Sequence, residues 1–411
     1  MTGCGTHGKK RTMKKMLNII SPVRNQRGVS MVIVGIAIGS AMLIGFAALA
    51  IDVGYLFAAR NELQNTADAS ALAATRKLGE LYQTMTYDEQ QAYECDPAPL
   101  IAIAKEVALK NQAARTNIVI NDADIVIGQW DGQTRTLTPT LFQPDAIQVT
   151  ARRDADANGP ITTFFARVFN IQSMDVIADA TAALTGKGTS EPGELELPIG
   201  ISQSWFDRGY YCGSQIKFSP TTDPDACAGW TAFEENPNDK TLRNILAGLI
   251  TSPATSTSDP TIFNFIGGDL SNPTFDALLT LFQGKGCDVD ASGNPILDSE
   301  GNPMTDATGT GLEVPLWADA EETIPLTYPD GTARNEHVWE TTVVIYGWDT
   351  CDNPNKPIPI TGYARILLTD VLDAPSKSVK GIVLCNLTDD DESRGGGGDY
   401  GTKGSIPGLV E

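Results

Sequence analysis

One uncharged segment close to the N-terminus limits what this chain can fold into more than any other feature. Residues 29–51 read VSMVIVGIAIGSAMLIGFAALAI, which is 23 residues without a charge. As a helix the segment would extend roughly 34 Å, and the hydrocarbon core of a bilayer is about 30 Å thick. We therefore predict a transmembrane helix over residues 29–51.

The charges on either side of this segment indicate its orientation. Residues 1–28 carry seven Lys and Arg residues and no acid, and Asp52 follows the segment. Because basic loops stay on the cytoplasmic side, we expect a basic cytoplasmic leader over 1–28, a single span of the inner membrane, and a periplasmic or extracellular body. A cleaved signal peptide is the alternative, since Ala48-Leu49-Ala50 resembles a cleavage site; signal h-regions, however, run only about 7 to 15 residues.

The chain beyond the leader is strongly acidic. It holds 23 of the 30 Lys and Arg residues and all 51 Asp and Glu residues, a net charge of −28. This charge disfavours nucleic-acid binding, in which Lys and Arg contact the phosphates. The sequence contains no P-loop, dinucleotide or serine-nucleophile motif, and His337 is the only histidine after the leader. We expect no enzymatic activity and no cofactor.

The helical pattern continues past the membrane. Residues 52–79 are rich in strong helix formers and contain no proline. Small and apolar residues recur there at spacings of three and four, which places them on one face of a helix. We predict one continuous rod whose outer half packs closely on a neighbouring helix or sheet. The predicted packing positions are Ala59, Leu63, Ala67, Ala71 and Ala74.

Three positions in or beside the membrane segment suggest contacts with other helices. Gly35 and Gly39 form a GxxxG motif, which allows a second helix to approach closely, as in a homo-oligomer; the alternative is a motif that arose by chance. Asp52 lies at the predicted membrane interface, where we expect it either to pair with a charge of a partner or to be solvated.

Residues 47–74, AALAIDVGYLFAARNELQNTADASALAA, resemble the N-terminal motif of the TadE/TadG-like proteins of Flp (tight adherence, type IVc) pilus assembly. A weaker resemblance over roughly 117–185 is to the domain that follows in TadG-like proteins. The resemblance implies a pilin-like, non-enzymatic component of pilus assembly or of the associated secretion machine. Its partners would be the membrane and other Tad/Flp pilus-assembly proteins. The alternative is a membrane-tethered or released calcium-dependent adhesin or binding protein.

The predicted fold class is α+β. Residues 52–185 combine the rod and a second helix at about 98–115 with several strand-like runs, and the segment TTFFARVF at 162–169 reads as helix. Short connections favour an antiparallel sheet against the long helix. The strand-like runs are 123–130, 134–138, 146–152 and 173–184.

The remaining chain is predicted to form a β-rich distal domain over 195–388, after a small polar linker at 186–194. Helical stretches at about 240–250 and 274–282 interrupt its strands. The acidic and Gly-rich residues 389–411 predict a flexible tail. In an alternative interpretation, the ending IPGLVE docks as a strand on a partner or on its own domain.

Six cysteines follow the membrane segment, an even number that indicates disulfides in an oxidising compartment. Their spacing favours Cys212 with Cys227 and Cys351 with Cys385, while Cys95 and Cys287 stay unassigned.

Residues 288–306, DVDASGNPILDSEGNPMTD, repeat an eight-residue unit. Asp288, Asp290 and Ser292, with Asp298, are weak calcium candidates, because the glutamate that completes an EF-hand loop is replaced by Ser299. The alternative is a pair of Gly-Asn-Pro turns, and we expect no other metal site.

Overall fold

The computed structural model describes residues 26–207, 215–218, 227–259, 261–268, 270–285, 287–289, 336–351, 354–389 and 392–410. These residues form two compact units. Unit 1 comprises residues up to Tyr55 together with Thr163–Gln172, and unit 2 comprises Leu56–Thr162 and Ser173–Glu411.

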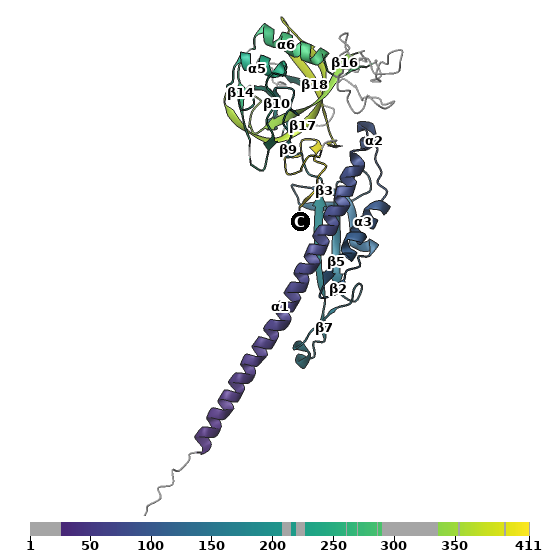
Figure 1. Ribbon diagram of the computed structural model, residues 1–411, viewed down its shortest axis with the longest axis vertical. Coiled ribbons are helices and arrows are strands. Elements are labelled where there is room, and N and C mark those ends of the chain that lie inside the picture. The colour runs from purple at the N-terminus through teal and green to yellow at the C-terminus, as the bar shows by residue number, and fades with distance from the viewer. Residues whose placement is uncertain are drawn as a thin grey trace, which may run out of the picture. The chain divides into compact units, whose positions relative to one another are not determined.

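Helix α1 (Gln26–Tyr82) is one uninterrupted helix of 57 residues (Figure 1). It contains no proline and is rich in Ala and Leu, so nothing in its sequence breaks the backbone hydrogen bonds. The continuous rod predicted from the sequence is therefore present.

Within unit 2, the outer part of α1 packs on a five-stranded antiparallel sheet of order β21-β8-β5-β3-β4. Side chains of α1, α3 and the sheet share one hydrophobic core. The α+β prediction is confirmed, with strand limits close to those expected. The elements are α2 (Tyr87–Gln91), α3 (Ala98–Leu109), β1 (Gln112–Ala113), β2 (Thr116–Asn117), η1 (Asp122–Asp124), β3 (Ile125–Asp131), β4 (Thr136–Pro139), β5 (Ala146–Arg153), β6 (Ile161–Thr162), η2 (Ala166–Phe169), β7 (Ser173–Met174), β8 (Val176–Ala183) and β21 (Gly408–Leu409).

Helix α3 ends earlier than its predicted limit of about 115. Residues 112–117 form the hairpin of β1 and β2 instead, and Ala114 and Arg115 at its turn have positive φ angles of 49° and 64°. The helix-forming composition of this stretch is overridden by the hairpin.

The later part of unit 2 is an eight-stranded sheet of order β11-β18-β17-β14-β12-β10-β16-β15, with helices α5 and α6 inserted between its strands. Because β17 also pairs with β16, strands β17, β14, β12, β10 and β16 form a closed ring. The predicted β-rich region with a helical insertion is thus present. Its elements are β9 (Thr189–Ser190), β10 (Ile199–Ser202), α4 (Gln203–Asp207), β11 (Gln215–Phe218), β12 (Ala228–Thr231), α5 (Asp239–Leu246), β13 (Thr255–Ser256), β14 (Ile262–Ile266), α6 (Asn272–Gln283), β15 (Cys287–Val289), β16 (Glu336–Tyr346), β17 (Pro357–Leu372), β18 (Ser378–Leu384), β19 (Leu387–Thr388) and β20 (Thr402–Lys403).

Residues 392–410 include two paired strands, so the prediction of a flexible tail over 389–411 is wrong for these residues. Strand β20 pairs with β19, and β21 adds antiparallel to β8, with Leu409 opposite Ala182. The alternative, in which IPGLVE docks as a strand on its own domain, is the arrangement that the structure shows.

The predicted linker 186–194 is also packed and not open. Its backbone lies against the glycine run 395–398, where the Gly397 N–H donates to the Gly186 carbonyl at 2.9 Å. A Cβ on Gly397 would lie 2.0 Å from the carbonyl oxygen of Lys187. The glycines therefore allow two backbone segments to lie close together. A glycine-rich composition alone does not distinguish this packing from disorder.

Candidate functional site

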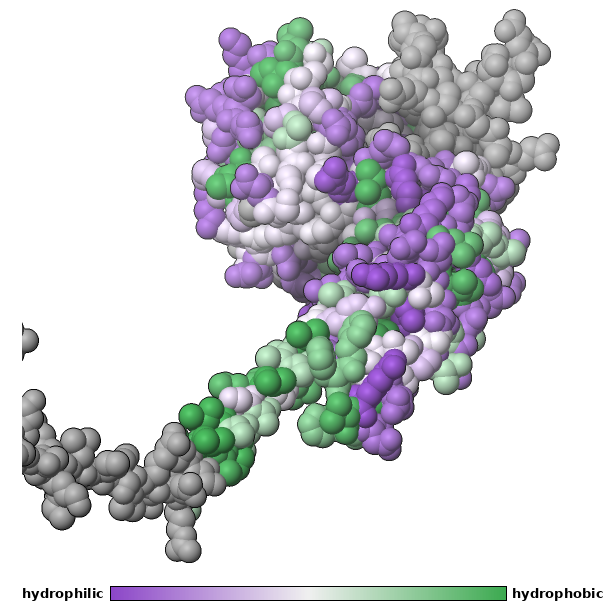
Figure 2. Space-filling model, turned by 60° about the horizontal axis from the view of Figure 1, so that its bottom comes forward, coloured by the Kyte–Doolittle hydropathy of each residue, from purple (hydrophilic) through white to green (hydrophobic). Residues whose placement is uncertain are grey.

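The first candidate surface is the membrane half of α1. Its large apolar side chains from Met31 to Ile51 are about half or more exposed, and they appear as the green rod in Figure 2. Among the described residues, α1 is the one helix long and apolar enough to cross a membrane. No atom lies within 4 Å of a Cβ built on Gly35 or Gly39, so both glycines face open space.

The side chain of Asp52 binds the backbone of the loop Thr163–Gln172 in unit 1. Its carboxylate accepts the N–H groups of Phe164, Phe165 and Ala166 at 2.8, 2.9 and 2.6 Å. These N–H groups stand at the start of the single helical turn η2, where the backbone has no partner of its own, so an acceptor there satisfies them. Asp52 is only 3% exposed, and the interpretation of a solvated side chain is wrong.

The same loop is closed by its own hydrogen bonds and by one ring contact with the helix. The Thr163 N–H donates to the Gln172 carbonyl at 3.1 Å, and Asn170 ends η2 in the left-handed conformation with φ 64°. The ring of Tyr55 meets that of Phe164 edge to face at 5.4 Å. Sequence reasoning missed this clamp, because Asp52 and its partners are more than a hundred residues apart.

The outer half of α1 carries the second candidate surface. The predicted packing positions Ala59, Leu63, Ala67, Ala71 and Ala74 are all buried, and the last four belong to the core shared with β5 and β8. Small side chains lie on the sheet side too, at Ala178, Ala180 and Ala182 of β8. Alanine against alanine lets the helix approach the sheet closely. This stripe is therefore covered by the chain's own sheet.

Polar contacts fix the position of this half of the helix. The Thr75 hydroxyl donates to the Ala182 carbonyl at 3.2 Å, and the Gln64 side chain donates to the Asp179 carbonyl at 2.8 Å. At the end of the helix, the Tyr82 hydroxyl donates to the Pro144 carbonyl at 2.8 Å.

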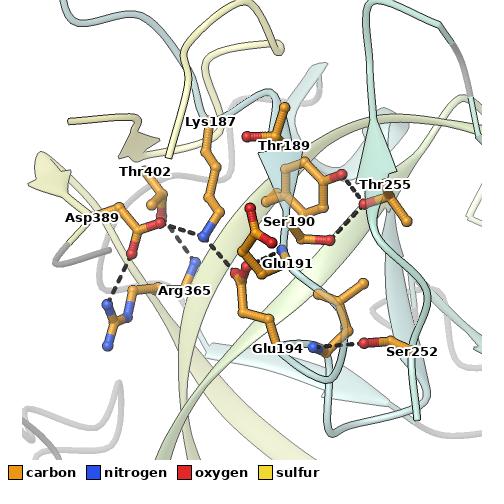
Figure 3. A network of polar contacts seen from close by, with 12 residues as sticks. Lys187, Thr189, Ser190, Glu191, Glu194, Ser252, Thr255, Arg365, Asp389 and Thr402 are labelled. Carbon is orange, nitrogen blue, oxygen red and sulfur yellow. Dashed lines mark hydrogen bonds and ion pairs between the residues drawn. The ribbon is translucent and has the colours of Figure 1, made fainter. Parts of the chain in front are cut away.

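A buried ionic network lies where residues 186–194, the predicted linker, meet the segment that follows β19 (Figure 3). The Lys187 ammonium, with 0% side-chain exposure, contacts the carboxylates of Asp389 and Glu194. Arg365 adds ion pairs to Asp389 at 3.3 Å and to Glu340 at 2.8 Å. Burial disfavours the ammonium, but the two carboxylates outweigh that effect and raise the pKa of Lys187. The network fastens the segment that follows β19 to the segment that precedes β10.

The cysteine pairing differs from the prediction. Cys227 is bonded to Cys351, so neither Cys212–Cys227 nor Cys351–Cys385 forms; Cys385 is itself disulfide-bonded, and Cys212 lies outside the described residues. Strands β12 and β16 both flank β10, which brings the start of β12 and the loop after β16 together across 124 residues of sequence. The predicted pairs were chosen for their short separation in sequence, which does not determine the pairing here. Cys95 is buried and not bonded.

The calcium candidates stay untested predictions. Asp288 has its backbone in β15, but its side chain and Asp290, Ser292 and Asp298 lie outside the described residues. Elsewhere in the described chain, no group of three or more His, Cys, Asp and Glu could hold a metal ion. His337 is a strand residue of β16 whose Nε2 lies 2.9 Å from the Phe282 carbonyl.

Two comparisons bear on the identity of the N-terminal region. Residues 30–77 match the family of putative Flp pilus-assembly TadE/G-like proteins, and residues 86–182 match the family of putative Tad-like Flp pilus-assembly proteins. No curated protein and no solved structure matches the chain. The first match covers the membrane half of α1 and its alanine stripe, and the second covers α2, α3 and most of the five-stranded sheet. Through residues 30–77 and 86–182, the chain is therefore similar to the Tad-like Flp pilus-assembly proteins.

Proposed function

We propose that the protein is a non-enzymatic, single-pass inner-membrane component of Flp/Tad pilus assembly or of the associated secretion machine. Residues 1–28 would be cytoplasmic, and the chain after Asp52 would lie in the periplasm or outside the cell. The observation that carries this proposal is the surface of α1 from Met31 to Ile51, whose apolar side chains are exposed all round. Such a surface is stable only in lipid or against other membrane helices.

We further propose that the membrane half of α1 makes the assembly contact, with Gly35 and Gly39 at the approach point. Their open surroundings matter here, because a larger side chain at either position meets nothing in the chain itself. A loss of assembly on substitution would therefore report on a second helix. Small residues at this spacing let helices pack closely in a membrane.

The test of helix contact is a pair of variants that each place a leucine in the membrane half of α1. Gly39→Leu should abolish cross-linked dimers and pilus assembly, whereas Ala37→Leu should retain both, because Ala37 lies on the opposite side of the helix at about 100° per residue. Both variants should reach the membrane in equal amount. Normal pili in Gly39→Leu cells would rule out this contact.

The orientation is tested separately by protease digestion. In spheroplasts, an added protease should reach only the chain after Asp52, while in inverted vesicles it should reach only residues 1–28. A mature protein that begins at Ile51 would instead show that the segment is a cleaved signal peptide.

A further inference from the structure

The loop Thr163–Gln172 carries an unusual concentration of exposed apolar side chains. Val168 is 84% exposed and Phe169 71% exposed, and Phe164, Phe165 and Ile171 are exposed as well. In unit 2, large apolar side chains are exposed singly, as at Leu249 and Ile262, or at most in pairs, as at Leu141 and Phe142. Scattered exposed residues are ordinary, but five within ten residues require a partner surface.

The clamp on Asp52 fixes where along α1 this loop lies. Three backbone N–H groups of the loop bind the carboxylate of the residue that directly follows the uncharged run 29–51. The Tyr55–Phe164 ring contact holds the loop at the same level of α1. A helix whose uncharged run fills the bilayer thus carries the loop at the boundary between hydrocarbon and headgroups.

The charge of the loop suits that boundary. Arg167 is the only charged residue in Thr163–Gln172, whereas the chain after residue 28 has a net charge of −28. Phenylalanine and aliphatic side chains of interfacial segments bury at the boundary of headgroups and acyl chains, and an arginine there reaches the phosphate groups while its stem stays in apolar surroundings.

We propose that the loop Thr163–Gln172 inserts its apolar side chains into the outer leaflet beside α1 and acts as a second membrane contact with affinity for anionic phospholipid. This inference rests on the proposed membrane span of α1. The lipid would be bound by Phe164, Phe165, Val168 and Phe169, with Arg167 at the headgroups, while Asp52 keeps the loop in place. The loop would then fix the rotation and tilt of α1 that a single helix leaves free.

The experiment uses the full chain in vesicles of phosphatidylethanolamine and phosphatidylglycerol that contain a phospholipid with a diazirine near the acyl carbonyl. After irradiation, mass spectrometry should find lipid adducts on residues 164–171 as well as on 31–51. In the double variant Val168→Ser/Phe169→Ser, the loop adducts should fall about tenfold relative to those on 31–51, whereas Leu249→Ser should leave them unchanged. Neither serine touches the clamp, which uses the backbone of residues 164–166.

The outcomes separate this inference from the proposed function. Adducts on 31–51 without any on 164–171 would overturn the lipid contact and leave the membrane span standing; adducts on neither would overturn both. A loop that is labelled in vesicles of the purified chain but shielded in the membrane of the producing bacterium would be covered by another protein, which also refutes the proposal. Replacing phosphatidylglycerol by a neutral lipid should lower the loop adducts in the wild type but not in Arg167→Gln.

Discussion

Removal of the Lys187 charge should destabilise unit 2 more than loss of any surface ion pair. In Lys187→Met, the apolar part of the side chain is retained, and the carboxylates of Asp389 and Glu194 lose the ammonium that lies against both. Their side chains are only 2% and 13% exposed, so water replaces that contact poorly.

The expected loss in the free energy of unfolding follows from the burial of these two carboxylates. Breaking a buried ion pair by removing one partner costs about 3–5 kcal/mol, because a buried charge is left uncompensated. Arg365 still lies 3.3 Å from Asp389 in the variant, so we expect the lower end, about 3 kcal/mol. At roughly 2–4 °C per kcal/mol for a large domain, the melting temperature should fall by about 6 °C or more.

The assay is thermal unfolding of the full chain in detergent at neutral pH, with limited proteolysis of residues 392–410 as a local reading. Lys77→Met is the matched control, since Lys77 pairs with Glu80 at 3.2 Å and both side chains are more than 40% exposed. Exposed pairs contribute at most about 1 kcal/mol. If Lys187→Met melts with the control and its C-terminal segment resists protease equally, the network does not fasten the two segments.

Three other predictions test separate parts of the fold. Ala71→Leu pushes a larger side chain between α1 and the sheet and should cost about 1–3 kcal/mol, seen as a lower melting temperature, whereas Gly45→Leu, where no atom lies within 4 Å of an added Cβ, should cost nothing comparable. Non-reducing peptide mapping should find Cys227 linked to Cys351, and replacing both by serine should cost about 2–5 kcal/mol; a Cys212–Cys227 peptide would refute this pairing. Because the pKa of Lys187 is raised, its contribution should be present at neutral and mildly alkaline pH and disappear as the pH rises through the folded-state value, so wild type and Lys187→Met should converge in strong alkali.

The features that could be predicted from the sequence are those that repeat along it. The rod was predictable because a 3.6-residue period and the absence of proline are local properties of residues 26–82. The strands of the five-stranded sheet were predictable for the same reason, since β-branched and apolar runs such as 146–152 are bounded by turn residues.

Apart from the local hairpin of β1 and β2, the features that were missed depend on residues far apart in the chain. A lone Asp52 after an apolar run is typical of an interface residue, and nothing near it indicates three backbone donors at residues 164–166. The glycines at 395–398 predict disorder unless the backbone of residues 186–188 is known to lie against them. The disulfide was mispredicted because sequence separation was used in place of strand order.

The C-terminal strand also bears on how such a protein can assemble. An uncovered sheet edge is a template for a strand of another chain. Here β21 pairs with β8 and so occupies that edge of the five-stranded sheet, and the Arg135 side chain holds the following residue through the Val410 carbonyl at 3.1 Å. The opposite edge is β4, a four-residue strand that ends in Pro139, and proline lacks the N–H that an added strand would need. Both edges are therefore poor acceptors for strand addition. The contact proposed for the membrane half of α1 does not depend on strand addition to this sheet.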